Sequence, residues 1–260
     1  MKKIAFIICL IISQLAMAQY APAGDSLKTR WASEVTPVNV WQEYPRPQIE
    51  RADWLNLNGL WDYAIRPKGE NNIGEFDGKI LVPFCVESSL SGVQKYVGKD
   101  NELWYQREFE VPSNWKGKRI LLHFGAVDWK CDVWVNGIKV GSHTGGYTPF
   151  SMDITQALKK KGNKLMVRVW DPTDQGEQPC GKQHVKPHGI WYTPVTGIWQ
   201  TVWLEPVNEN HIVDLKIVPD VDNKSVVVKP EIANPSSDNM LEIKGPRRRH
   251  DGLSAGAAQG

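Results

Sequence analysis

Short runs of alternating apolar and polar residues, each ended by a glycine or proline turn, are the feature that most restricts the fold of this chain. Strict alternation has the two-residue period of a strand with one buried face. The clearest case spans residues 131–141, where Asn136-Gly137 is flanked by Val135 and Ile138. A two-residue Asn-Gly loop needs positive φ at both positions, so this stretch predicts a tight hairpin.

Further strand-like runs cover residues 59–65, 104–111, 119–124, 164–170 and 199–205. Helical periodicity is scarce. The one helical signal is Asp153–Leu158, with Thr155 as a candidate cap and Gly162 as the stop. Many short strands joined by glycine and proline turns predict an all-β chain built as an antiparallel β-sandwich.

The sequence changes character after Pro206. Residues 211–218 and 225–233 predict two further strands, which are too few for a sandwich that needs about seven strands. Residues 245–260 are rich in Arg, Gly and Ala, so we expect them to be disordered. The predicted organisation is one sandwich at 19–207, the start of a second at 208–244, and an aberrant tail at 245–260.

The first eighteen residues have the layout of a secretory signal peptide. Lys2 and Lys3 precede an apolar run at 4–15, and Ala16-Met17-Ala18 is a small-residue cleavage site. The apolar run is too short to span a membrane. We expect cleavage after Ala18 and a secreted or periplasmic protein with no membrane partner; an uncleaved anchor is the alternative.

Net charge gives no sign of a nucleic-acid partner. The whole chain carries +2, and both the leader lysines and the Arg-rich tail contribute +2 each, so residues 19–244 carry −2. Such a body offers no basic surface to a phosphate backbone. Three cysteines follow the leader, so at most one disulfide forms, and Cys85 and Cys131 are expected to be buried free thiols because they lie in strand-like runs.

Motifs for metals and nucleotides are weak or missing. Cys180, His184 and His188 have spacings found in metal sites, but Pro179 and Pro187 prevent a helix that would align them. A fourth ligand is not visible, so we interpret them as loop residues. The sequence contains no P-loop or G-x-G-x-x-G motif, and no cofactor is predicted.

Four ordered segments resemble the N-terminal sugar-binding domain of glycoside hydrolase family 2, which includes β-galactosidases and β-glucuronidases. The longest is VNGIKVGSHTGGYTPFSMDIT at 135–155, and the others are LNGLWD at 57–62, WYQREF at 104–109 and TGIWQTVWL at 196–204. The resemblance implies a jelly-roll, galactose-binding-like sandwich, then an immunoglobulin-like domain, then a barrel that holds the chemistry.

The same resemblance places the two catalytic glutamates in that barrel, where the acid/base follows an asparagine. Retaining glycosidases hold such a pair about 5–5.5 Å apart. The Asn-Glu pairs of this sequence end in Glu102 and Glu209, which we expect to be solvated acids in a loop and a linker. No catalytic residue is therefore assigned, and we expect a chain truncated before the barrel and inactive alone.

The candidate sugar contacts are Asp171, Trp191 and Tyr192. The tripeptide GIW occurs twice; Trp199 opens a strand, whereas Trp191 lies in a loop between Pro187 and Pro194. In the family this loop leans toward the mouth of the barrel. A carboxylate accepts bonds from sugar hydroxyls and aromatic rings stack on sugar faces; the alternative is that these residues only cap and pack the loop.

The function expected from the sequence is the non-catalytic N-terminal part of an exported family 2 enzyme, whose partner is a carbohydrate. Two alternatives stay open: a free-standing, lectin-like carbohydrate-binding module, and a purely structural sandwich. The resemblance implies that the barrel selects the sugar and its linkage.

Overall fold

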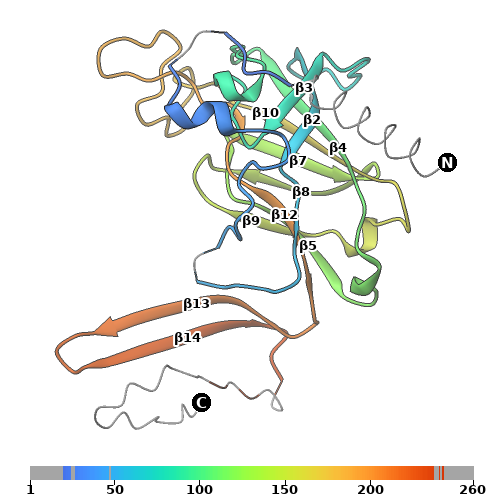
Figure 1. The fold of residues 1–260 in the computed structure, drawn as a ribbon, viewed down its shortest axis with the longest axis vertical. Helices are drawn as coiled ribbons and strands as arrows, with labels where there is room; N and C mark the ends of the chain where they lie inside the picture. The colour runs from blue at the N-terminus through green and yellow to red at the C-terminus, as the bar shows by residue number, and fades with distance from the viewer. Residues whose placement is uncertain (1–19, 25–26, 47, 237–239, 241, 243–260) are drawn as a thin grey trace, which may run out of the picture.

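The computed structural model describes residues 20–24, 27–46, 48–236, 240 and 242. Strands dominate these residues, and two antiparallel sheets contribute to one core (Figure 1). The predicted all-β fold and β-sandwich are confirmed. Helical segments in the described part of the chain are 3-10 turns at Arg30–Glu34, Ser89–Ser91, Ser113–Trp115 and Thr155–Ala157.

The larger sheet has six strands in the order β3-β2-β4-β10-β7-β8. Their bounds are β2 Gly59–Pro67, β3 Gly78–Val82, β4 Asn101–Phe109, β7 Lys130–Val135, β8 Ile138–Thr144 and β10 Asn163–Trp170. Along β10, Val167 and Val169 are fully buried, whereas Arg168 between them is half-buried on the outer face. This alternation gives the sheet one inner, apolar face.

The smaller sheet has the order β1-β12-β5-β9. Its strands are β1 Leu55–Asn56, β5 Arg119–Phe124, β9 Phe150–Asp153 and β12 Val202–Val207, and a short pair joins β6 Val127–Asp128 to β11 Gly197–Ile198. Both faces of β12 are buried. Leu204 faces the core between the sheets, while Glu205 bonds to side chains of the segment that precedes β1.

Two turns show how local sequence sets the fold. Asn136 and Gly137 have φ of 54° and 83°, and Val135 pairs with Ile138, so the predicted hairpin is confirmed. Gly197 has φ of 95°, and a Cβ there would lie 2.0 Å from the hydroxyl oxygen of Tyr105. Only glycine fits where β11 crosses the buried Tyr105 ring.

Two sequence predictions are wrong. Residues 153–158 do not form a regular helix, because the Thr155 hydroxyl accepts a bond from the Ile120 N–H and the segment closes as a single 3-10 turn beside β5. Glu102 is not a solvated loop acid. It lies within β4, is 6 % exposed, and accepts a bond from the Gly69 N–H.

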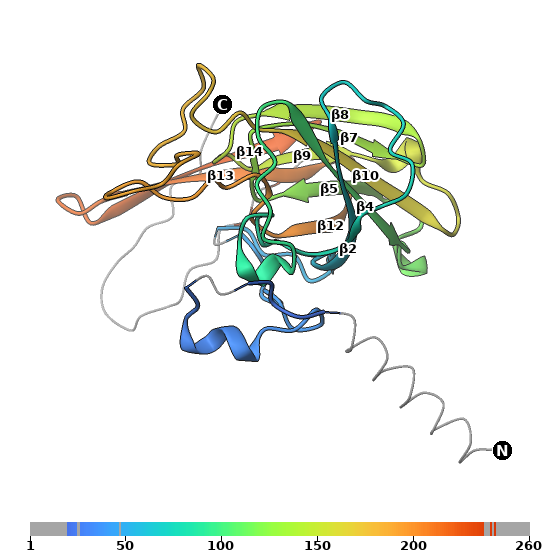
Figure 2. The ribbon, with the colours of Figure 1, turned by 90° about the horizontal axis from the view of Figure 1, so that it is seen from above.

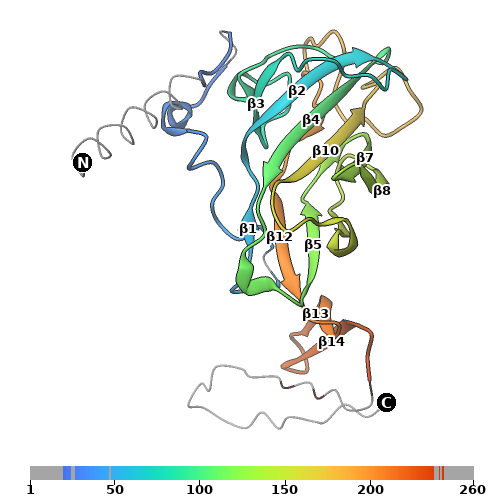
Figure 3. The same ribbon diagram turned by 90° about the vertical axis from the view of Figure 1, so that its right-hand side faces the viewer.

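Beyond β12 the chain forms an antiparallel hairpin of β13, His211–Asp220, and β14, Ser225–Ala233, as predicted. The hairpin extends away from the sandwich, and within the described residues its strands pair with each other (Figures 1 and 3). The predicted signal peptide at 1–18 and tail at 245–260 lie outside the described residues. Among the helices that are described, none has the length and apolar character needed to cross a membrane.

The three cysteines after the predicted leader are free thiols. Cys131 is buried on β7, and Cys85 and Cys180 are partly exposed. Burial raises the pKa of Cys85 and of Cys131 to about 12, so both stay protonated. The expectation of free thiols is met, although Cys85 is less buried than expected.

Candidate functional site

The long loop between β10 and β11, residues 171–196, carries all three candidate sugar contacts. It projects from one end of the sandwich, far from the β13–β14 hairpin at the other end (Figures 1 and 3). Seen from above, along the direction that separates them, the loop and the hairpin overlap (Figure 2). The three residues differ in solvent exposure. Asp171 is 2 % exposed, whereas Trp191 and Tyr192 are 38 % and 67 % exposed.

Asp171 braces the loop from inside. Its carboxylate accepts a 2.7 Å bond from the Thr173 N–H and a 2.8 Å bond from the Thr196 hydroxyl, so it joins the first and last residues of the loop. Burial raises its pKa, and these bonds act in the opposite direction. Contact between Asp171 and a sugar stays a prediction; what the geometry supports directly is loop positioning.

Backbone bonds hold Trp191 and Tyr192 in place: the Trp191 N–H donates to the His188 carbonyl at 3.0 Å, and Tyr192 pairs with the stretch opposite. The Tyr192 N–H donates to the Lys182 carbonyl at 2.8 Å, and the Tyr192 carbonyl accepts from the His184 N–H at 2.9 Å. The Trp191 ring lies 5.5 Å from the His184 ring, which in turn is 2.9 Å from the Asp174 carboxylate. The aromatic pair is therefore fixed in the loop and open to solvent.

A buried polar contact that sequence reasoning missed fastens this loop to the sandwich. The Gln183 side-chain amide donates to Asp128 at 2.9 Å and accepts from the Val195 N–H at 2.7 Å. Asp128 is 4 % exposed, and burial, with the nearby charge of Asp171, raises its pKa to about 7. A Cβ on Gly146 would lie 2.5 Å from this carboxylate, so the Asp128 side chain fits here because residue 146 has no side chain.

The cysteine and histidines singled out by their spacing lie in the same loop. His184 and His188 have ring centroids 6.0 Å apart. Across the described residues, no group of three or more His, Cys, Asp and Glu side chains is arranged to hold a metal ion. Their observed contacts are those of loop residues.

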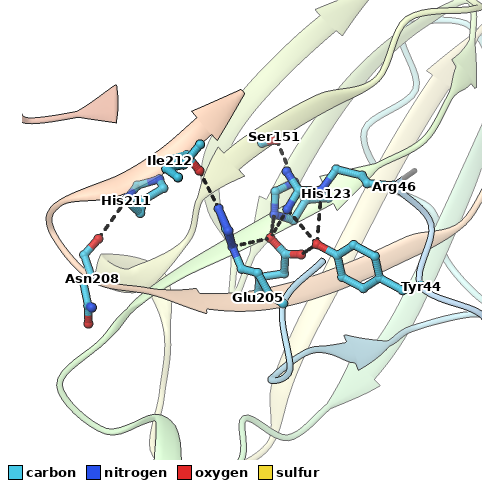
Figure 4. Close-up of polar contacts among 9 residues, drawn as sticks. Tyr44, Arg46, His123, Ser151, Glu205, Asn208, His211 and Ile212 are labelled. Atoms are coloured by element: carbon cyan, nitrogen blue, oxygen red, sulfur yellow. Dashed lines mark hydrogen bonds and ion pairs between the residues drawn. The ribbon is translucent and has the colours of Figure 1, made fainter. Parts of the chain in front are cut away.

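A second polar cluster lies at the opposite end of the sandwich, around Glu205 on β12 (Figure 4). Glu205 is fully buried. Its carboxylate lies 2.5 Å from Arg46, 3.3 Å from Arg51 and 3.2 Å from Nε2 of His123, and it accepts a bond from the Tyr44 hydroxyl. We call these residues the Glu205 cluster.

The Glu205 cluster holds a permanent charge. Burial alone would raise the pKa of Glu205, but bonds from His123 and Tyr44 and the charge of Arg46 lower it to about 2. Burial lowers the pKa of His123, and the bond to Glu205 acts in the opposite direction; its Nδ1 lies 2.7 Å from the Ser151 hydroxyl. A buried, fully paired carboxylate is suited to bracing and not to proton transfer.

The cluster also reaches the hairpin. Nη2 of Arg51 donates to the Ile212 carbonyl on β13 at 2.7 Å, while its Nε faces Glu205 (Figure 4). The sequence contains one signal for the Glu205 cluster, namely an acid between Leu204 and Pro206 in an otherwise apolar strand. A charge in such a strand requires buried partners, but the partners lie far away in the sequence.

Comparison with known proteins connects these features to one family. Residues 79–204 match the model described as "Glycosyl hydrolases family 2, sugar binding domain". A β-galactosidase of Thermoanaerobacter pseudethanolicus is 36 % identical over 174 residues, which are 65 % of this chain and 23 % of the relative. A β-glucuronidase of Paenibacillus borealis is 26 % identical over 220 residues, which are 77 % of this chain and 37 % of the relative.

Solved structures agree on the fold. The crystal structure of Ruminococcus gnavus β-glucuronidase superposes with a TM-score of 0.56 at 23 % identity, over 73 % of this chain and 34 % of that one. The same enzyme in complex with D-glucuronic acid gives a TM-score of 0.55 at 24 % identity, over 74 % of this chain and 36 % of that one. The chain thus spans about a quarter to a third of the length of these proteins.

Proposed function

Residues 79–204 form a sugar-binding domain of glycosyl hydrolases family 2, and from this membership we propose that the chain is the N-terminal, non-catalytic part of an exported enzyme that hydrolyses O-glycosyl bonds. In this proposal the chemistry belongs to a barrel in the remainder of the enzyme. The part of this chain is to shape one side of the sugar pocket and to support the barrel.

The observation that carries the proposal is the exposed aromatic pair Trp191–Tyr192 on an anchored loop. Loop residues positioned by a rigid scaffold are common binding elements. The anchors are the buried side chains Asp171 and Asp128, which hold the loop ends and the Gln183 segment. A fixed ring loses little conformational entropy when a sugar stacks on it, which favours a binding role.

We propose no turnover by this chain alone. Retaining hydrolysis needs two carboxylates about 5–5.5 Å apart across the glycosidic bond. The two glutamates in Asn-Glu pairs occupy separate elements: Glu102 is buried in β4, and Glu209 lies between β12 and β13 near Arg119. Neither belongs to the loop that carries the aromatic pair.

Export and domain organisation complete the proposal. The leader at 1–18 supports secretion or delivery to the periplasm, with Gln19 as the first mature residue. A jelly-roll domain at 19–207 would be followed by an immunoglobulin-like domain that begins at the β13–β14 hairpin. N-terminal sequencing of the exported protein tests this, and a start at Met1 would contradict it.

The activity test is a panel of nitrophenyl β-galactosides and β-glucuronides incubated with the purified chain. We expect no release of nitrophenol. Release that a family inhibitor abolishes would contradict the non-catalytic assignment. Calorimetric titration with the same sugars separates the alternative function: dissociation constants of about 1 mM or tighter, lost in Trp191→Ala, favour a free-standing lectin-like module, because the exposed pair would then suffice for binding.

A further inference from the structure

The outer face of the six-stranded sheet carries a second set of aromatic and charged side chains, apart from the 171–196 loop. A cavity of about 170 Å³ opens there, lined by Lys68, Glu102, Lys130, Asp132, Arg168 and Trp170. Three of these residues are cations and two are acids. Pockets for drug-sized ligands measure about 300–1,000 Å³, so this one has room for a small group and not for an extended chain.

Arg168, which lines this cavity, belongs to a set of stacked side chains from three strands. The Trp104 ring of β4 stacks on the Trp134 ring of β7 with centroids 5.8 Å apart, and the Arg168 guanidinium of β10 lies 5.4 Å and 5.6 Å from them. Arg168 also lies 2.5 Å from Asp132 and 3.8 Å from Glu102. The charge of Arg168 is therefore satisfied within the protein.

Two ammonium groups at the rim are not satisfied in this way. Lys68 and Lys130 are both exposed, and neither makes an ion pair with a carboxylate in the described part of the chain. Lys68 Nζ lies 3.5 Å from the centre of the Trp170 ring, and the Trp170 N–H donates to the Lys99 carbonyl at 2.7 Å. Trp170 thus holds Lys68 over the cavity through a cation–π contact.

The acids in the cavity do not offset these two cations. Asp132 is engaged by Arg168, by Lys139 at 2.6 Å and by the Ser142 hydroxyl at 2.6 Å. Glu102 is 6 % exposed and bonds to the Gly69 N–H. An incoming ligand therefore meets two ammonium groups that have no carboxylate partner, which favours an anionic group.

We propose that this cavity is a second saccharide site, which binds the carboxylate of an acidic sugar between Lys68 and Lys130. Trp170 acts as a positioning residue for Lys68. The choice of a sugar as the carrier of the charge rests on the proposed function, whereas the selection of an anion rests on the cavity alone. The site would hold an acidic glycan against the sheet while the 171–196 loop faces its own ligand.

The test is calorimetric titration of the purified chain at low salt with methyl α-D-galacturonide, methyl α-D-galactoside and sodium sulfate. The α-anomers are chosen because the relatives are named as β-glycosidases. We expect the galacturonide to bind, with an affinity that falls as salt is added, and the neutral galactoside not to bind. Lys68→Gln and Lys130→Gln should each weaken binding about tenfold, since each removes a charge-assisted contact.

Matched variants locate the site. Lys164→Gln removes an exposed lysine from the far end of the same face of β10 and should leave the affinity unchanged. Galacturonide affinity in the two lysine variants reports on this site, whereas the response of methyl β-glucuronide to Trp191→Ala reports on the 171–196 loop, so failure of the loop to bind sugar and failure of this site give different results. Equal binding of galacturonide and galactoside, sulfate binding as tightly as galacturonide, or retention of affinity in both lysine variants would overturn the proposal.

Discussion

The carboxylate of Glu205 lies 2.5 Å from the guanidinium of Arg46, and this ion pair joins the last core strand of the sandwich to the segment that precedes the first. Glu205 is fully buried while Arg46 is 24 % exposed at its side chain. Removing one partner from such a pair leaves a buried charge without compensation, which costs far more than the pair contributes by itself. Substitution of either residue of this pair should therefore lower the stability of the fold strongly.

Glu205→Ala should lower the free energy of unfolding by about 3 kcal/mol or more, because Arg46, Arg51 and His123 lose their common acceptor. Denaturant unfolding followed by tryptophan fluorescence measures this loss. Asp214→Ala, at an exposed position on β13, is the control and should change stability by less than about 0.5 kcal/mol. Similar losses in both variants would contradict a special role for Glu205.

The same carboxylate predicts a specific acid sensitivity. Its pKa is about 2 in the folded chain against an ordinary value of 4.5. A lowered pKa stabilises the fold above the unfolded value, and this stabilisation is lost as pH falls from about 4.5 through 2. In Glu205→Gln the stability should fall less steeply over that window than in the parent chain, and identical slopes would contradict the assignment.

Asp128 predicts the opposite dependence in the 171–196 loop. Its pKa is raised to about 7 from 3.8, so ionisation costs the folded state an increasing amount between pH 4 and 7, after which the cost is constant. Asp128→Asn keeps an acceptor for Gln183 and removes the charge. Hydrogen exchange of loop amides at pH 8 should be slower in this variant than in the parent, whereas at pH 4 the two should match.

Gly197 tests the packing of the short β6–β11 pair. A Cβ would lie 2.0 Å from the Tyr105 hydroxyl oxygen and 3.0 Å from Leu103, so Gly197→Ala should destabilise by about 3 kcal/mol from overpacking and strain. Gly162→Ala shares the positive φ but meets nothing within 4 Å, and should cost about 1 kcal/mol. Thermal unfolding separates them; equal losses would mean that the contact with Tyr105 is relieved by a small shift.

The features predicted correctly from the sequence are those that depend on neighbouring residues. Asn136-Gly137 predicted its turn because two adjacent positive φ angles are tolerated by few residue pairs. Trp191 and Trp199 share a tripeptide, yet the prolines around Trp191 correctly placed it in a loop. The family segments also predicted the sandwich, since each is an element of the core or a turn beside it.

The burial and the partners of the polar side chains could not be predicted, because they depend on residues far away in the sequence. The burial of Asp171 depends on Thr196, at the far end of the loop, and the burial of Glu102 depends on its place in the middle of the sheet. Glu205 meets Arg46 and His123, which lie 159 and 82 positions away. A single sequence contains the charge but not the partners that satisfy it.

Saturation-transfer difference NMR shows whether Trp191 faces a sugar, because the method detects weak binding. Methyl β-glucuronide and methyl β-galactoside are mixed in turn with the purified chain, with Trp191→Ala, and with Trp31→Ala, a more exposed tryptophan outside the loop. We predict weak transfer, from binding with a dissociation constant above about 1 mM, to the ring protons of at least one sugar in the parent and in Trp31→Ala, and its loss in Trp191→Ala. Transfer that survives Trp191→Ala, or no transfer to either sugar, would show that Trp191 does not contact the sugar.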